Sequence, residues 1–214
     1  RSLGNLRKVD LGFQTENVVM FGLRPATKYE DGRKLVVYRE VLQNLAATPG
    51  VKAAGANSVR LMTGGRWDGD LTLRGAGVTD SDQPYSFYNA VTPGYFETLG
   101  IKVTQGRDFT WSDWGSPQKL ALVNVELARK HFANTSPIGH KLAQGRGNDL
   151  DTEIIGVFSN AHYDEVRGDV PPQTFVSMGS ARQLSNANSL NVYVRAIGDP
   201  RSVIPQLREV VRRT

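Results

Sequence analysis

The feature that most constrains the fold is a unit of strand, polar turn and amphipathic helix that occurs at both ends of the chain. Near the N-terminus, residues 18–23 form an apolar run rich in β-branched side chains. Residues 33–47 then place apolar side chains on one helical face. A Thr-Pro-Gly stop leads into a second strand at residues 51–59, whose small side chains suit close packing beneath a helix. This end of the chain therefore predicts a β-α-β unit.

The C-terminal end repeats the pattern. Residues 190–195 alternate as a half-buried strand does, and Asp199 can cap a helix that Pro200 begins. The apolar residues between positions 203 and 211 form one stripe on that helix. Because the ends of a split α+β fold can share one sheet, we expect residues 18–23 to lie beside residues 190–195.

The middle of the chain, residues 60–182, differs in character from the two ends. It contains short strands, turns and two brief helices, and it predicts an antiparallel-rich unit. The predicted fold is therefore of the α+β class, a split βαβ sandwich with an inserted β-rich subdomain. The sandwich takes residues 1–59 and 183–214, and the insert takes residues 60–182.

The stretch 91–110 is predicted to be architectural, because it places aromatic and aliphatic side chains in a core and carries no reactive group. A strand at residues 85–91 leads to Thr92 as a candidate N-cap, with Pro93 as a good first helical residue. A short helix over residues 94–99 ends at a glycine, and we expect this stretch to support the insert. The residues assigned to this motif are Pro93, Gly94, Tyr95, Phe96, Gly100 and Gly106.

Composition excludes several classes of function. The 214 residues carry a net charge of +5, but the basic residues are scattered among 21 acidic ones and no nucleic-acid motif is present, so we expect no nucleic-acid partner. The chain has no cysteine, which rules out disulfides and thiolate chemistry. No apolar run approaches the roughly 18 residues that a membrane-spanning helix needs.

Candidate site residues are few. His131, His140 and His162 lack metal-site spacing, so we expect neither a metal nor histidine catalysis. Ser180 has no identifiable base partner, and no catalytic residue is assigned. A loop with oxygen ligands lacks the glycine and spacing of a calcium loop, and we expect it to be solvated; its oxygen-bearing residues are Asn148, Asp149, Asp151 and Glu153.

Two tryptophan-containing turns are the candidate interaction residues. Arg66 lies beside Trp67, and Trp111 and Trp114 flank another turn. Exposed Trp and Arg side chains are common at protein interfaces. The favoured interpretation is that these bulky side chains cover small cores.

Six segments together resemble the periplasmic core domain of MacB-like and FtsX-like ABC transporter permeases. They lie in the family's order and cover nearly the whole chain: SLGNLRKVDLGFQTENVV (2–19), TPGVKAAG (48–55), VTPGYFETLGIKVTQGRDFT (91–110), ALVNVELARKHF (121–132) with SPIGHKL (136–142), EIIGVFSNAHYDEVRGDVPPQTFV (153–176) and VYVRAIGDPRSVIPQLREVVR (192–212). The first segment is similar to that of the large permeases first noted in Acidobacteria.

The resemblance implies a fold and a function. The family's domain lies on the periplasmic side of the inner membrane, between two transmembrane helices of the permease. A porter-like βαβ subdomain is built from both chain ends, with a smaller β-rich insert. The domain is not an enzyme and holds no cofactor, because a separate cytoplasmic module binds and hydrolyses ATP. Consistent with this, the chain has no Walker-type glycine-rich motif.

The implied partners are the permease's own transmembrane helices, the ATPase module and a periplasmic protein, with a dimer in the full transporter and a monomer for the isolated domain. The alternative function is a periplasmic small-molecule or peptide-binding domain with a cleft between sandwich and insert. Two features depart from the family pattern. The pattern continues past Thr214 into another strand, which would leave a strand of the sheet outside this sequence, and residues 174–178 lack a proline common there.

Overall fold

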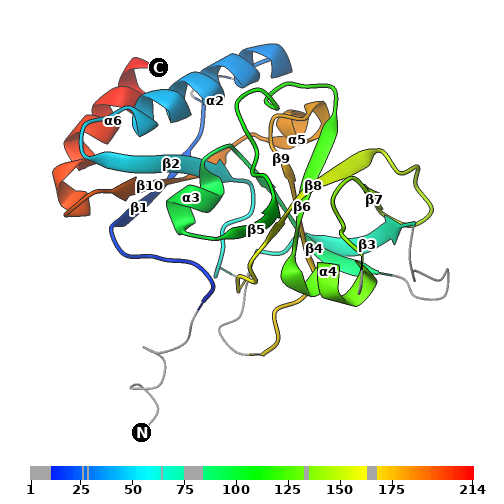
Figure 1. Ribbon diagram of the computed structural model, residues 1–214. Helices are drawn as coiled ribbons and strands as arrows, with labels where there is room; N and C mark the ends of the chain where they lie inside the picture. The colour runs from blue at the N-terminus through cyan, green and yellow to red at the C-terminus, as the bar shows by residue number, and fades with distance from the viewer. Residues whose placement is uncertain are drawn as a thin grey trace, which may run out of the picture.

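The computed structural model describes residues 11–25, 27, 29–63, 65–74, 84–132, 135–162 and 168–214. Within them the chain forms ten strands, five α-helices and one short 3₁₀ helix (Figure 1). In chain order the elements are β1 (Val18–Leu23), α2 (Asp31–Ala46), β2 (Val51–Asn57), β3 (Asp68–Leu73), β4 (Tyr85–Val91), α3 (Tyr95–Leu99), β5 (Val103–Gly106), β6 (Lys119–Asn124), α4 (Val125–Phe132), β7 (Lys141–Gln144), β8 (Thr152–Phe158), β9 (Gln173–Ser177), α5 (Ala181–Asn186), β10 (Leu190–Ala196), η1 (Pro200–Ser202) and α6 (Ile204–Arg213).

The mixed helix and strand content of the predicted α+β class is confirmed. The ends of β1 and β4 fall where the sequence patterns place them, and Asp199 caps η1 by accepting a hydrogen bond from the Arg201 N–H. Helix α5 was not predicted. Six residues are too few to show a helical period, and this helix is held by contacts from α2.

The strands from the two chain ends lie side by side. β10 pairs antiparallel with β1 on one side, with Val18 opposite Arg195, and with β2 on the other. The expected pairing of residues 18–23 with residues 190–195 is therefore confirmed. Helices α2 and α6 cover one face of these three strands, while α3 packs on the other face (Figure 1).

The remaining strands close into a ring. β4 pairs with β3, and the path runs through β7, β8 and β6 to β9, which pairs parallel with β4 again. Most of these pairings are antiparallel, but β6 and β8 are also parallel. β5 adds to β8 outside the ring. Closure leaves the six strands of this ring, which we call the strand ring, without a free edge between them.

The strand ring and the three terminal strands join at one place, where Asn57 of β2 pairs with Val91 of β4. The ring strands all come from residues 60–182, and the terminal strands from outside that range. Helix α5 crosses the predicted boundary at residues 182 and 183. The assignment of two separate subdomains stays a prediction.

The predicted start of α3 was wrong. Thr92 does not cap this helix, because its Oγ1 accepts a hydrogen bond from the Ala56 N–H at 2.7 Å. Pro93 lies in the turn, and Gly94 precedes the helix with a φ of 81°. A side chain on Gly94 would approach the Ala54 carbonyl oxygen to 2.5 Å, so β2 and this turn meet backbone to backbone. Tertiary contact with β2 replaces the local cap.

The stretch 91–110 begins at the junction, which is the place where Val91 of β4 pairs with Asn57 of β2, and it does not lie within the insert alone. Tyr95 and Phe96 are buried. The centroid of the Tyr95 ring lies 6.2 Å from that of Phe175 in β9 and 5.9 Å from that of Tyr193 in β10. Gly100 ends α3 with a φ of 66°, and Gly106 ends β5. Gly94, Tyr95 and Phe96 therefore lie where the strand ring meets the terminal strands, whereas Gly106 lies against β8 of the strand ring.

Candidate functional site

The tryptophans at 111 and 114 lie against α2. Their rings stand 5.5 Å apart, and the Trp114 indole N–H donates to the Leu35 carbonyl at 2.9 Å. The guanidinium of Arg39 lies 5.9 Å from the Trp111 ring centroid. Trp114 is buried, so it joins the segment after β5 to α2, as a side chain covering a core does. A partner contact at the partly exposed Trp111 stays a prediction.

The other predicted pair, Arg66 and Trp67, lies at the start of β3. The Arg66 guanidinium is 3.3 Å from the Asp68 carboxylate and 5.0 Å from the centroid of the Phe87 ring. Trp67 stacks on Tyr88 of β4 at 5.4 Å. Trp67 is partly exposed, whereas Tyr88 is buried. The structure places this pair on the strand ring and the pair at 111 and 114 on α2, and an interaction role for either stays a prediction.

Helix α2 holds the C-terminal end of α5. The buried Lys34 ammonium donates to the carbonyls of Leu184 and Ser185 at 3.2 and 3.3 Å, and Tyr38 donates to the Ala187 carbonyl at 2.9 Å. These carbonyls lie at the C-terminal end of a helix, where the negative end of the helix dipole attracts a cation; the Leu184 carbonyl also accepts from the Ala187 N–H at 3.0 Å. The Ser185 hydroxyl donates to the Asp31 carboxylate, and this bond lowers the pKa of Asp31.

Arg195 is a buried cation held by backbone carbonyls. Its guanidinium donates to Thr98 of α3 at 2.8 Å and to Glu16 and Gln14 at 2.8 and 3.0 Å. One side chain of β10 thus fixes both the segment before β1 and the helix at the junction. The sequence shows only a charged residue at the end of an alternating strand. Nothing local marks these acceptors, which lie 97 to 181 residues away.

Asp108 is a carboxyl group whose ionisation is changed by burial. Burial raises its pKa to about 6; the neighbouring Glu97 and Asp113 carboxylates act the same way, while the Phe109 N–H and Arg107 oppose the shift. The carboxylate accepts from the Phe109 N–H at 2.6 Å. Its neighbour Asp113 is held by the Arg107 guanidinium at 2.7 Å. These contacts order the turn after β5.

The histidines and the acidic loop were the candidates for a metal site. In the part of the chain that the structure describes, no group of three or more His, Asp or Glu side chains could hold a metal ion. His140 packs on Phe132, with ring centroids 5.3 Å apart. In the acidic loop, Asp151 pairs with Lys119, and Glu153 belongs to β8. Ser180 precedes α5.

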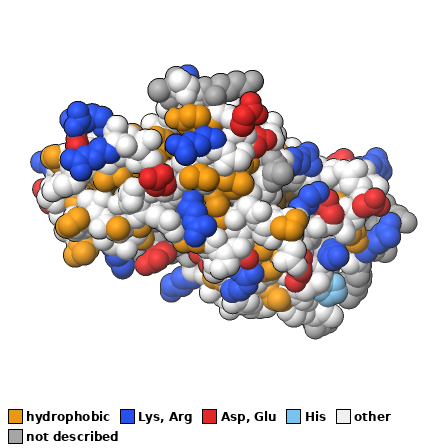
Figure 2. Space-filling view, turned by 90° about the horizontal axis from the view of Figure 1, so that it is seen from above, with side chains coloured by type: hydrophobic (Ala, Val, Ile, Leu, Met, Phe, Trp, Pro, Cys, Tyr) orange, Lys and Arg blue, Asp and Glu red, His pale blue; other side chains and the backbone are white. Residues whose placement is uncertain are grey.

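An apolar groove lies between β1 and α6. Its volume is about 440 Å³, and Val19 and Phe21 of β1 line it together with Leu207 and Val211 of α6. β1 is the end of the strand order, with β10 as its one strand neighbour among the described residues. Over α2 and α6, Lys and Arg side chains are interspersed with Asp and Glu rather than gathered into a stripe (Figure 2).

None of the helices in the described part of the chain is long and apolar enough to span a lipid bilayer.

Solved structures share this fold. The periplasmic region of MacB from Actinobacillus actinomycetemcomitans superposes with a TM-score of 0.59 at 17% identity, covering 99% of this chain and 87% of that one. The extracellular domain of the noncanonic ABC-type transporter YknZ from Gram-positive bacteria gives 0.52 at 19%, covering 91% and 88%. A domain of a putative permease from Porphyromonas gingivalis gives 0.51 at 19%, covering 81% and 68%.

Sequence comparison agrees. An uncharacterized ABC transporter permease of Bacillus subtilis (strain 168), YknZ, is 25% identical over 127 residues, which is 58% of this chain and 30% of that protein. The match therefore spans less than a third of the relative's length. The family model of the MacB-like periplasmic core domain matches residues 4–212. The chain belongs to the family of MacB-like periplasmic core domains.

Proposed function

We propose that this chain is the extracytoplasmic domain of an ABC transporter permease and transmits conformational change to periplasmic partners or substrate. It would lie on the periplasmic side of the inner membrane, carry no catalytic residue and hold no cofactor. ATP would be bound by a separate cytoplasmic module. The observation that carries the proposal is the family match over residues 4–212, almost the entire chain.

The internal contacts support a mechanical role. A domain passes on a displacement only if its parts move together, and packed cores with satisfied polar contacts deform little. Arg195 ties the segment before β1 to α3, and Lys34 and Trp114 tie α2 to α5 and to the segment after β5. A force applied near the chain ends would therefore reach the strand ring through buried contacts.

The partners follow from the same assignment. We propose that the domain contacts the transmembrane helices of its own permease and depends on the ATPase module, and that a periplasmic protein binds it. The full transporter would be a dimer through its membrane and ATPase parts.

The test uses the absence of cysteine, which makes every introduced thiol in this chain unique. In the full-length permease that contains this chain, Arg146→Cys, on the exposed turn between β7 and β8, would carry a spin label in each copy. We expect the distance between the two labels to change when ATP is added. An unchanged distance during active ATP hydrolysis would contradict force transmission.

Two controls separate domain motion from other causes. A permease with a hydrolysis-blocked ATPase module should show no cycling between distances. In the isolated chain, labels at Lys52→Cys on β2 and Arg146→Cys should give one narrow distance, because the domain is expected to move as a unit. A broad distribution there would mean that the strand ring moves independently of the terminal strands.

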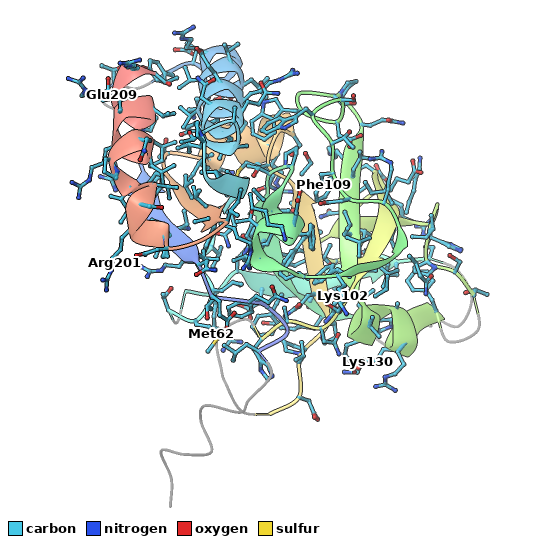
Figure 3. The ribbon with its side chains drawn as sticks, turned by 60° about the vertical axis from the view of Figure 1, so that its left-hand side comes forward. Met62, Lys102, Phe109, Lys130, Arg201 and Glu209 are labelled. Carbon is cyan, nitrogen blue, oxygen red and sulfur yellow. The ribbon has the colours of Figure 1, made fainter. Side chains whose placement is uncertain are left out.

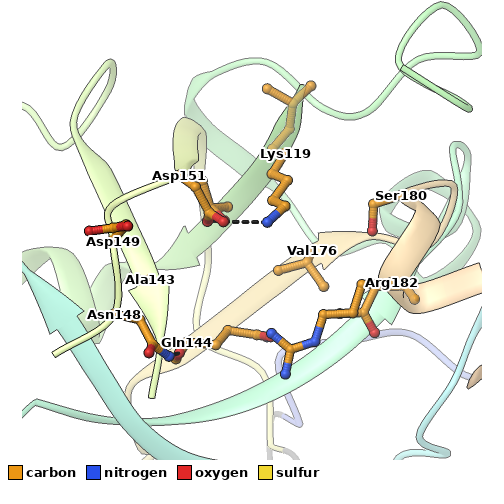
Figure 4. Close-up of a pocket in the computed structure, with 12 residues that line it drawn as sticks. Lys119, Ala143, Gln144, Asn148, Asp149, Asp151, Val176, Ser180 and Arg182 are labelled. Atoms are coloured by element: carbon orange, nitrogen blue, oxygen red, sulfur yellow. Dashed lines mark hydrogen bonds and ion pairs between the residues drawn. The ribbon is translucent and has the colours of Figure 1, made fainter. Parts of the chain in front are cut away.

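The alternative, a periplasmic small-molecule or peptide-binding domain, calls for a pocket with unmatched polar groups. The polar pocket at one end of the strand ring (Figure 4) has one such group, the shielded Nε2 of Gln144, which supports this alternative.

A further inference from the structure

Strand β1 presents unpaired backbone groups along its free edge. The Ala196 N–H of β10 donates to the Asn17 carbonyl at 2.8 Å, one residue before β1 begins. Hydrogen-bonded and unbonded pairs alternate in an antiparallel ladder, so the N–H and C=O groups of Met20 and Gly22 point away from β10. These groups have no hydrogen-bond partner among the described residues. Such an edge is a template for one more strand.

Apolar hollows flank this edge on both faces of the sheet. Successive side chains of a strand point to opposite faces. Val19 and Phe21 line the groove under α6, of about 440 Å³. Val18 and Met20 line a second hollow on the opposite face, of about 360 Å³. Met62, in the turn between β2 and β3, lines it as well (Figure 3). A strand beside β1 would therefore place its alternate side chains in two apolar hollows.

The path of the chain indicates which strand this would be. β1 and β2 run parallel with the antiparallel β10 between them, so the crossover through α2 passes over β10. α2 and α6 cover the same face of these strands (Figure 1). Crossovers between parallel strands are almost always right-handed. Because β10 runs opposite to β1, a right-handed crossover from β10 over this face leads the other way, past β1 to its free edge.

The position of α6 agrees with this path. Leu207 and Val211 of α6 line the groove together with side chains of β1, whereas α2 packs on β2. The helix that follows β10 therefore lies over β1 already. Connections between a helix and the next strand usually take two to six residues, so a strand soon after Thr214 would reach this edge.

We propose that the free edge of β1 is the docking site of the stretch of permease chain that directly follows Thr214. This segment forms a strand of about five residues, antiparallel to β1, and pairs with the backbone of Met20 and Gly22. Its side chains fill the two hollows, so it is apolar on both faces. The inference rests on the proposal that the chain is one domain of a longer permease, but it does not depend on force transmission.

The first test reads the residues that follow Thr214 in the gene. We expect an apolar run of about five residues that begins within about six residues of Thr214. A polar or charged stretch there would overturn the docking proposal, and so would an apolar run of about 18 residues or more, which is long enough to span a membrane. Either result would leave force transmission by the domain untouched.

The second test compares hydrogen exchange in two chains. One is the 214-residue chain, and the longer chain adds about 15 residues of its natural continuation. We expect the Met20 and Gly22 amides to exchange at least about tenfold more slowly in the longer chain. Equal exchange in the two chains would overturn the proposal. Protection in the 214-residue chain that rises with its concentration would assign the edge to a second copy and would also contradict it.

Two proline variants separate this edge from the pairing with β10. Gly22→Pro removes an N–H that faces away from β10, so the urea midpoint of the 214-residue chain should not change. In the longer chain this variant should abolish the added protection of Met20. Phe21→Pro is the matched control, because its N–H faces β10 and its loss should lower the midpoint of both chains.

Met20→Lys provides a second variant at the same edge. It places a charge in the hollow that an apolar side chain of the docked strand would share, while Met20 is only partly buried in the 214-residue chain. We expect it to reduce the protection of Gly22 in the longer chain at least about tenfold. Full protection in both Gly22→Pro and Met20→Lys would contradict docking at this edge.

Discussion

Arg195 shows how one residue can hold distant segments together. A buried guanidinium that lacks a carboxylate must have its N–H groups satisfied by other acceptors. Here the carbonyls of Thr98, Glu16 and Gln14 supply them. The same three bonds satisfy carbonyls of α3 and of the segment before β1. The residue therefore stabilises a junction between elements that are far apart along the chain.

Replacing this residue should be costly. Arg195→Met keeps the apolar stem but leaves three carbonyls without a donor, and we expect the free energy of unfolding to fall by about 3 kcal/mol. Urea unfolding measures this loss, and hydrogen exchange should show reduced protection in residues 14–18. The matched control is Arg212→Met, an exposed arginine paired with Glu209, with a change within about 0.5 kcal/mol. Similar losses for both variants would contradict the assigned role.

Asp108 gives stability a pH dependence of unusual sign. Its pKa is about 6 in the folded chain, against an ordinary value of 3.8, chiefly because burial disfavours the charged carboxylate. The folded state thus binds more protons than the unfolded state between these values. The contribution of Asp108 to the free energy of unfolding is therefore most favourable below about pH 4, and it falls as the pH rises through about 6.

The variant Asp108→Asn tests this sign. The substitution removes the buried charge, and the side-chain oxygen of asparagine can still accept from the Phe109 N–H. We therefore expect the free energy of unfolding to rise by about 2 kcal/mol at about pH 7.5. The difference in the free energy of unfolding between the variant and the wild type should shrink toward about pH 4, because the wild-type carboxyl becomes protonated. Urea unfolding at several pH values measures it. A difference that does not vary with pH would show that the charge is not responsible.

At the scale of elements, the segment after β5 is fixed to α2 by Trp114. The indole N–H reaches the Leu35 carbonyl of the helix, and the ring belongs to the larger hydrophobic core. Close packing adds to this contact: a side chain on Gly179 would approach the Trp114 ring to 2.7 Å. Position 179, two residues after β9, must therefore stay free of a side chain.

Trp114→Phe tests the link between the two elements. Phenylalanine keeps an aromatic ring but loses the hydrogen bond to Leu35, and we expect a loss of about 1–2 kcal/mol in the free energy of unfolding. Trp111→Phe is the control, because its ring is partly exposed and lies beside Trp114. We expect less than half the loss for it. A larger loss in the control would assign the link to Trp111.

Elements also show where local patterns mislead. Thr92-Pro93-Gly94 has the composition of a helix start, yet Thr92 bonds to β2 and the helix begins at Tyr95. A threonine hydroxyl can accept a hydrogen bond from an N–H of the following helix or from an N–H of a distant strand. Here it accepts from the Ala56 N–H of β2, because Ala56 is fully buried and its N–H has no water to donate to. In contrast, β4 spans the residues that its sequence pattern predicts, because this strand is buried along nearly its whole length.

For the whole molecule, the isolated chain is expected to be a monomer. The parts proposed to form the dimer lie outside this chain, and charges of both signs are mixed on the face over α2 and α6 (Figure 2). Sedimentation velocity at micromolar concentration should give one species near the chain mass of 23.5 kDa. A tight dimer would contradict this expectation and would direct attention to the groove between β1 and α6.

The sequence by itself determined the strands and helices with a clear period, the pairing of the two chain ends, and the family. A hydrophobic period is a local property of the sequence, so it can be recognised without knowledge of the fold. Only the tertiary structure decided the closure of the strand ring, the start of α3, helix α5, and the burial of Arg195 and Asp108. The partners of several of these features lie far away along the chain, as with Tyr38 and Ala187, 149 residues apart. Burial and hydrogen-bond demand, rather than local preference, select such contacts.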